Sequence, residues 1–205
     1  MTKSPKIIIK YLNKDANASF NVTKNEMLLL ILLAYKTIQY QVTVTLKGEG
    51  AVAQILGIVI GAGTEQINLH TFQNHEAPHT RSNLLIKSAL TDRSLLNYEG
   101  IIKVNKGAQL TDAYQRNENL LLSAEAKAET KPALEILAND VRCTHSATVG
   151  KIDADQLFYL ESRGLHTSQA KTLIVTGFFQ SILDKIPNIS TKRNLLKKIQ
   201  VLKFV

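Results

Sequence analysis

Between Gln41 and Thr148 the sequence repeats one local pattern: a short run of strand-forming residues, then a polar, glycine- or proline-bearing break, with no helical period in between. The expected strands are Gln41–Leu46, Ala51–Ile60, Gln66–Phe72, Ser82–Ala89, Tyr98–Val104, Leu120–Ala126, Leu134–Leu137 and Val141–Thr148. No strict sequence repeat is visible, so the series permits a sandwich, a barrel or a solenoid. The hairpin dipeptides Asn-Gly and Asp-Gly are absent from the sequence, which favours a solenoid because stacked parallel rungs do not need hairpins.

Two apolar runs indicate strands that are buried on both faces. Ala51–Ile60, AVAQILGIVI, is too apolar for a strand with one wet face. Met27–Ala34, MLLLILLA, has eight residues, against about 20 for a membrane-spanning helix. Met1–Lys10 lacks a signal-peptide pattern, and the single cysteine, Cys143, cannot form an internal disulfide. We therefore expect a cytoplasmic protein without a membrane span.

After Gly150 the apolar period changes from two to three and four, which predicts helices near 153–163 and 167–186. Asp153 and Gln156 are spaced as in a capping box, and Gly164 after Arg163 is typical of a helix stop. Thr167 or Ser168 is the expected N-cap of the second helix. Its expected apolar stripe consists of Ala170, Leu173, Ile174, Gly177, Phe178 and Ile182.

Positive charge is concentrated at the C-terminus. The chain has 25 Lys and Arg against 17 Asp and Glu, a formal net charge of +8. Six of these basic residues and no acidic residue lie between Lys185 and Val205. This pattern predicts a solubilising or poorly ordered basic tail over 188–205, or one that contacts an acidic partner or nucleic acid. A nucleic-acid-binding protein is an alternative. Such a protein would need Lys and Arg spread over one face, with aromatic side chains between them.

Several segments together resemble one known family. LKGEGAVAQILGI (Leu46–Ile58) and INLHTFQNHEAPHTRSN (Ile67–Asn83) are similar to its conserved core. GAQLTDAYQRNENLLLS (Gly107–Ser123) and KPALEILANDVRCTHSATVGKIDADQLFYLESRGL (Lys131–Leu165) form the most specific part of the likeness. The sequence resembles the SufB/SufD family of iron–sulfur cluster assembly scaffolds, and RCTHSATVG around His145 resembles its SufD branch.

The resemblance implies a mainly β fold: a right-handed parallel β-helix followed by a small C-terminal helical unit. The corresponding division is a β-helix core over 1–150, with 1–40 poorly matched, a helical unit over 151–187 and the basic tail over 188–205. Family members are usually longer at the N-terminus, so the chain is expected to be a minimal or a truncated form. The resemblance also implies partners: a SufC-like ABC ATPase docked at the helical end, and a SufB-like subunit or a second copy paired through the β-helix.

Candidate site residues follow from alternation and from the resemblance. Cys143 and His145 are two apart on one expected strand, so their side chains share a face, and imidazole and thiolate are both iron ligands. In the family this histidine lies at the subunit interface where a transient iron–sulfur cluster, shared with the partner, is assembled. Phe158, Tyr159, Arg163 and Gly164 are the implied ATPase-docking residues. A flavin is expected only in the assembled complex.

Catalysis by this chain alone is not expected. The sequence has neither GxxxxGK[ST] nor GxSxG. A β-helical carbohydrate-active enzyme is the remaining alternative, but it would need acids clustered in a groove, and the acids of residues 41–150 are scattered singly. His75 and His79 have a spacing that suits a metal only on a helix, and Pro78 predicts a loop, so we expect hydrogen-bonding roles for them.

Overall fold

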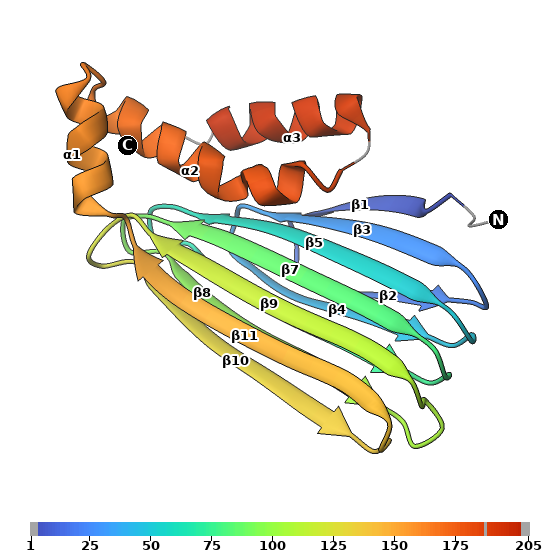
Figure 1. Ribbon diagram of the computed structural model, residues 1–205. Helices are drawn as coiled ribbons and strands as arrows, with labels where there is room; N and C mark the ends of the chain where they lie inside the picture. The colour runs from blue at the N-terminus through green and yellow to red at the C-terminus, as the bar shows by residue number, and fades with distance from the viewer. Residues whose placement is uncertain (1–3, 187, 202–205) are drawn as a thin grey trace.

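The computed structural model describes residues 4–186 and 188–201 and contains two parallel β-sheets with helices on one of them (Figure 1). Sheet A has the order β1-β3-β5-β7-β9-β11, and sheet B the order β10-β8-β6-β4-β2. Consecutive strands therefore alternate between sheets, and each strand pairs in parallel with the strand two places along the chain. This is a parallel β-helix, as expected.

The structure fixes the bounds of each element. The sheet A strands are β1 (Lys6–Leu12), β3 (Met27–Ala34), β5 (Val52–Gly61), β7 (Arg81–Leu90), β9 (Thr111–Leu121) and β11 (Val141–Lys151). The sheet B strands are β2 (Ala16–Val22), β4 (Ile38–Leu46), β6 (Gln66–His75), β8 (Leu95–Val104) and β10 (Lys127–Ile136). The helices are α1 (Ala154–Ser162), α2 (Thr167–Leu183) and α3 (Ile189–Val201).

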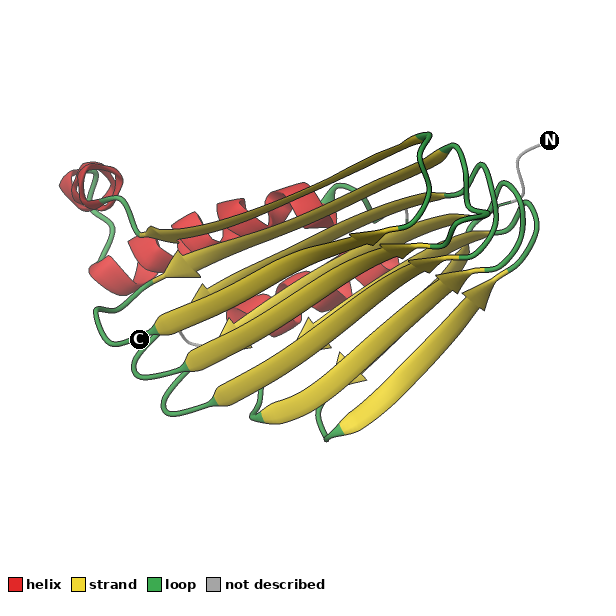
Figure 2. Ribbon diagram, turned by 90° about the horizontal axis from the view of Figure 1, so that it is seen from below, coloured by secondary structure: helices red, strands yellow, loops and turns green. Residues whose placement is uncertain are grey.

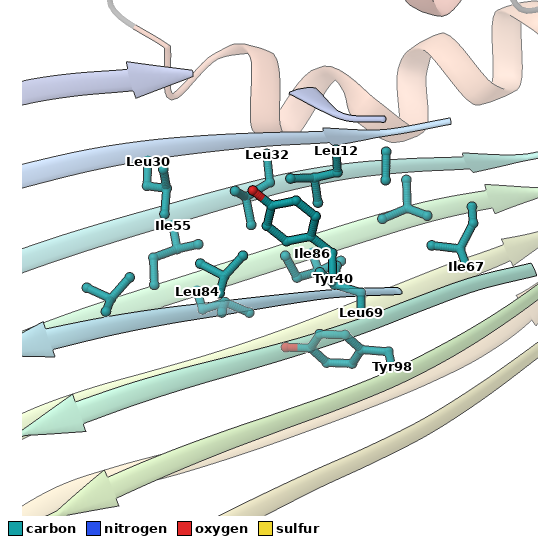
Figure 3. Close-up of a cluster of buried hydrophobic side chains, with 14 of the residues drawn as sticks. Leu12, Leu30, Leu32, Tyr40, Ile55, Ile67, Leu69, Leu84, Ile86 and Tyr98 are labelled. Carbon is teal, nitrogen blue, oxygen red and sulfur yellow. The ribbon is translucent and has the colours of Figure 1, made fainter. Parts of the chain in front are cut away.

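The hydrophobic core lies between the two sheets, where inward side chains stack in columns from rung to rung. One column runs from Leu30 through Ile55 to Leu84 on sheet A, and all three side chains are buried. Tyr40, Leu69 and Tyr98 face them from sheet B (Figure 3). Each fully buried aliphatic side chain stabilises the fold by about 1.5–3 kcal/mol.

Helices α2 and α3 cover the outer face of sheet A, which creates a second apolar layer. Val175, Phe179 and Ile182 of α2 and Leu195 of α3 are buried in one cluster with outward residues of β3, β5 and β7. β3 and β5 are accordingly buried on both faces, which explains their continuous apolar sequences. None of the described helices lies over the outer face of sheet B (Figure 2), and its strands β6 and β8 alternate between buried and partly exposed residues.

The strand predictions were wrong at two places and incomplete at a third. The expected strand at Leu120–Ala126 is mostly a turn, and the strand lies before it, at β9 (Thr111–Leu121), because the inward positions of β9 are polar residues that do not resemble a core strand. β10 starts at Lys127, seven residues before the expected Leu134. Strands β1 and β2 were not predicted, and residues 6–40 build rungs of the solenoid within the core expected over 1–150.

Both predicted helices are present, with differences at their edges. His166, not Thr167 or Ser168, is the N-cap of α2; the Thr167 hydroxyl instead donates to Glu161. Gln169 Oε1 accepts from the His166 backbone N–H at 3.0 Å. The buried residues of α2 are Ala170, Val175, Phe179, Ile182 and Leu183, so the buried face is displaced from the expected stripe.

The segment expected to be a basic tail contains helix α3. Leu195 is buried and Leu196 packs against the second apolar layer, while Arg193 and Lys197 are exposed. The alternation of apolar and basic residues thus forms an amphipathic helix, and the expected poor order is not found over the described residues 188–201.

Gly48 permits two successive turns of the solenoid to stack. A Cβ at Gly48 would lie 2.0 Å from the backbone N and 2.4 Å from the Cα of Lys24 in the turn of the preceding rung. We predict that Gly48→Ala destabilises the protein by about 1–3 kcal/mol, since backbone atoms cannot rotate away. Urea unfolding measures the change. Gly107→Ala is the control, because nothing lies within 4 Å of a Cβ there, and equal effects of the two changes would contradict the prediction.

His75 is buried at the corner between β6 and β7 with both ring nitrogens bonded. Nδ1 lies 2.7 Å from Thr80 Oγ1, and Nε2 lies 2.9 Å from Ser82 Oγ. Thr80 donates its proton to the Ala77 carbonyl, so it accepts from Nδ1–H, and Nε2 accepts from Ser82. Burial lowers the pKa of His75 from 6.5 to about 4.

This pKa predicts a pH-dependent stability. Between pH 6.5 and 4 the unfolded chain binds a proton at His75 that the folded chain does not, so stability falls as the pH falls, by about 3 kcal/mol over that window. Urea unfolding at pH 7 and pH 5 should show a smaller pH-dependent loss for His75→Gln than for the wild type. His79→Asn, at an exposed turn position with φ 57°, should keep the wild-type loss; an unchanged loss in His75→Gln would refute this origin.

Candidate functional site

The rung formed by β10 and β11 is the C-terminal end of the solenoid. Within the described chain β11 is hydrogen-bonded to β9 alone, and β10 to β8 alone. The outer edges of both strands therefore present unpaired backbone groups. Such an edge can pair with a strand of another chain.

His145 lies at the open end of the inward-facing column that contains Leu84 and Gln115. The parallel register places His145 beside Gln115 on β9, and Gln115 beside Leu84 on β7. Gln115 is fully buried, whereas His145 is exposed because no rung follows it. The imidazole therefore points in the direction of a core side chain, yet another molecule can reach it from the open end.

Cys143 shares the inward face of β11 with His145 and is more enclosed. Its partner in the register is the buried Ala113, and its side chain packs with Val141 against a small apolar cluster at this end. Burial raises the pKa of the Cys143 thiol above its ordinary value. A thiol in this setting is a poorer metal ligand than a free thiolate.

The interior below His145 is polar, unlike the hydrocarbon interior of earlier rungs. Gln73 Nε2 donates to Gln115 Oε1 at 3.3 Å, and Gln115 Nε2 donates to the Gly100 carbonyl at 3.1 Å. Thr71 and Tyr98 share a 2.8 Å hydrogen bond in the same region. This polar set was not predicted; its signal in the sequence is the polar residues at alternate positions of β9.

Two of the other histidines, His70 and His75, have side-chain partners in the fold. His75 is bonded to Thr80 and Ser82, as described above, and His79 is exposed on the following turn, so the two do not form a metal site. His70 Nδ1 lies 3.0 Å from Glu99 on the outer face of sheet B. Among the described residues no group of three or more His, Cys, Asp and Glu side chains is placed to hold a metal ion.

Glu99 and Glu129 line a shallow hollow on sheet B, together with His70 and Lys131. Acids that line a common hollow are the feature that a carbohydrate-active β-helix would need. Glu99 is paired with His70 at 3.0 Å, and Lys131 lies beside Glu99 in the strand register. Basic side chains thus lie next to the acidic side chains of the hollow.

Helix α1 projects from the end of the solenoid and has no buried residue. Phe158 is 71% exposed and Tyr159 56% exposed. The Arg163 guanidinium carbon lies 5.2 Å from the centroid of the Tyr159 ring, a cation–π distance. Gly164, with φ +92°, ends the helix with the hydrogen-bond pattern of a Schellman motif. Tyr159 and Arg163 therefore share one exposed surface beside Phe158.

A groove with a volume of about 510 Å³ separates α1 and α2 from the ends of β9 and β11. Its apolar lining includes Leu120, Ile152, Leu160, Leu173 and Phe178. Four residues of the expected α2 stripe line this groove: Leu173, Ile174, Gly177 and Phe178. Phe178 also packs against the second apolar layer. An apolar stripe on a helix predicts burial, but the local sequence does not show that this part of the stripe faces a groove.

The two groups of candidate residues lie apart along β11. His145 lies near the middle of the strand, whereas α1 follows its last residue, Lys151 (Figure 1). Six residues of strand correspond to about 20 Å. The structure brings Cys143 and His145 onto one face and the α1 residues onto another surface, and it does not bring the two groups together.

An open-ended parallel β-helix with an appended helical pair defines the class of protein. Residues 11–178 match the family described as SUF system FeS cluster assembly, SufBD core domain. The chain belongs to this SufBD family, as the resemblance of its motifs implied. Helix α3 lies beyond the matched residues.

Curated relatives agree with this assignment. An iron–sulfur cluster assembly SufBD family protein of Synechocystis is 35% identical, over 89% of this chain and 42% of its own length. The iron–sulfur cluster assembly proteins SufD of Escherichia coli and Bacillus subtilis are 32% and 29% identical, over 82% and 94% of this chain. The chain spans only 40% and 44% of the length of those two SufD proteins. No described helix is long and apolar enough to cross a membrane.

Proposed function

We propose that this chain is a non-ATPase, cytoplasmic scaffold subunit of a SUF-type assembly complex. It pairs through the β10–β11 rung with a SufB-like subunit or a second copy of itself, and it docks a SufC-like ABC ATPase through α1 and α2. The observation that carries the proposal is the open end rung, where unpaired edges and the exposed His145 lie side by side. Membership of the SufBD family supplies the iron–sulfur chemistry.

In this mechanism the iron–sulfur cluster is cargo at the rung interface. His145 offers an imidazole nitrogen, a suitable iron ligand, while the partner supplies the further ligands. Cys143 contributes less because burial raises its pKa. The strands hold the imidazole on a rigid face, so its position depends on the register with β9 rather than on a mobile loop. We assign no residue of this chain to a flavin, which would belong to the assembled complex.

The α1 surface is the proposed site for the ATPase. Exposed aromatic side chains next to an arginine are typical of binding hot spots. Because α1 buries none of its residues, its aromatic side chains contribute to binding without supporting the core.

We predict that Phe158→Ala and Tyr159→Ala each weaken ATPase binding by about 2 kcal/mol, roughly thirtyfold, with little change in stability. Calorimetric titration of the purified ATPase into the chain measures affinity, and thermal unfolding measures stability. Ile189→Ala is the control, because Ile189 is 69% exposed but lies on α3. Wild-type affinity in both aromatic variants would place the docking site elsewhere.

We further predict that His145→Ala lowers cluster assembly more than Cys143→Ala does. Complementation of a strain lacking its SufD-type subunit measures assembly, and circular dichroism confirms that each variant folds. Thr144→Ala is the control, because Thr144 is exposed on the opposite face of the same strand. Full complementation by a folded His145→Ala protein would show that His145 is a structural residue of its rung.

A further inference from the structure

Lys87 is a buried cation at the contact between α2 and the solenoid. Its side chain is 8% exposed and projects from β7 on the outer face of sheet A. Nζ donates to the Phe178 carbonyl in the middle of α2 at 2.8 Å and lies 4.4 Å from the centroid of the Phe178 ring. Glu118 on β9 completes the site with an ion pair of 2.8 Å.

The position of this contact on α2 allows it to control the orientation of α1 and of the first part of α2. The residues by which α2 packs in the second apolar layer, from Val175 to Leu183, lie on both sides of Phe178. Nearer to α1, Leu173 and Ile174 line the groove instead, as does Leu160 of α1. Among the described residues, Lys87 supplies the polar anchor between α2 and the sheet.

The backbone of β7 joins Lys87 to a second set of hydrogen bonds, on the inner face of sheet A, that reaches the edge strand. Ser88, the next residue, donates to Asn119 Oδ1 at 2.6 Å. Asn119 Nδ2 donates in turn to the Thr148 carbonyl of β11 at 2.9 Å. In the register Glu118 lies beside both Lys87 and Thr148. A continuous set of contacts therefore runs from the α2 backbone to the strand that carries His145.

Stability alone does not account for a charge at this place. The neighbouring outward residues of sheet A, such as Leu85 and Ile58, are aliphatic and pack directly against the helices. Replacing a buried ion pair with apolar residues of similar volume is often neutral or stabilising. A cation that donates to one specific carbonyl, in contrast, fixes both the rotation of α2 and its position along the sheet.

We propose that Lys87 is a positioning residue that fixes the orientation of α1 and α2 relative to β11. In the proposed function, which this inference extends, the same contact couples the ATPase-docking helices to the cluster-assembly edge. It acts through Phe178 and Glu118 and touches neither the ATPase nor the cluster.

The test measures the distance between α1 and β11 in the chain alone. Spin labels at Ser162→Cys and Thr144→Cys, in a Cys143→Ser background, report this distance by pulsed electron resonance. Both label positions are exposed. We expect Lys87→Met to broaden or shift the distance distribution, and Lys87→Arg to restore most of the wild-type distribution because it keeps the charge and the donor. Glu118→Gln should produce an intermediate change.

The control is Lys103→Met, which removes another lysine from a cross-strand pair, with Glu135 at 2.7 Å on sheet B, away from the helices. Lys87→Met should still fold, since Glu118 keeps its ion pair with Arg116 at 3.0 Å, and circular dichroism verifies this. If a folded Lys87→Met distribution matches that of Lys103→Met, the proposal is wrong. If Lys87→Met does not fold, an unaltered distribution in folded Glu118→Gln also refutes it. Because no ATPase is present, neither result bears on whether α1 is the docking site.

Discussion

The parallel pairing of each strand with the strand two places along the chain is the constraint on which the rest of the structure depends. It aligns equivalent positions of successive rungs, so that inward residues form columns and turns stack on turns. Apolar columns then supply the core, and Gly48 is required where two turns meet. The same pairing leaves an unsatisfied edge at each end of the described solenoid, and one of these edges places an inward-directed histidine within reach of a partner.

The sequence predicted the strands that are buried on both faces and failed where inward positions become polar. Met27–Ala34 and Ala51–Ile60 were recognised because a strand buried on both faces has no polar face. Its sequence therefore lacks the usual alternation of apolar and polar residues. β9 was missed because its inward polar residues find hydrogen-bond partners inside the fold, which only the three-dimensional register provides. Gln115 is bonded to Gln73, Asn119 to Asn117, and these three residues of β9 all donate to neighbouring carbonyls. No repeat was visible because the number of residues in one turn of the solenoid changes along the chain. Lys6 pairs with Leu28 near the start, whereas the longer turn that begins at Arg81 pairs this residue with Asp112.

Alternation along β11 was sufficient to place Cys143 and His145 on one face, but not to show that their rung is the last one. Exposure of His145 follows from the end of the sheet, which is a property of topology and not of local sequence. Lys87 was not identified either, because an isolated lysine in a strand is normally solvent-exposed. Its burial depends on α2, about ninety residues later in the chain, and no local pattern carries that information.

The separation of the two candidate surfaces explains why a rigid body between them is useful. A strand ladder changes little in length or twist without breaking hydrogen bonds, so a displacement imposed on α2 cannot be absorbed within the solenoid. It can be absorbed at the helix–sheet contact, where aliphatic side chains permit sliding and directional bonds oppose it. A buried donor at that contact therefore determines how much movement of the helices reaches β11, and the apolar layer around it determines how strongly the helices adhere. Stability and orientation of the helical unit thus depend on different residues, and they can be altered separately.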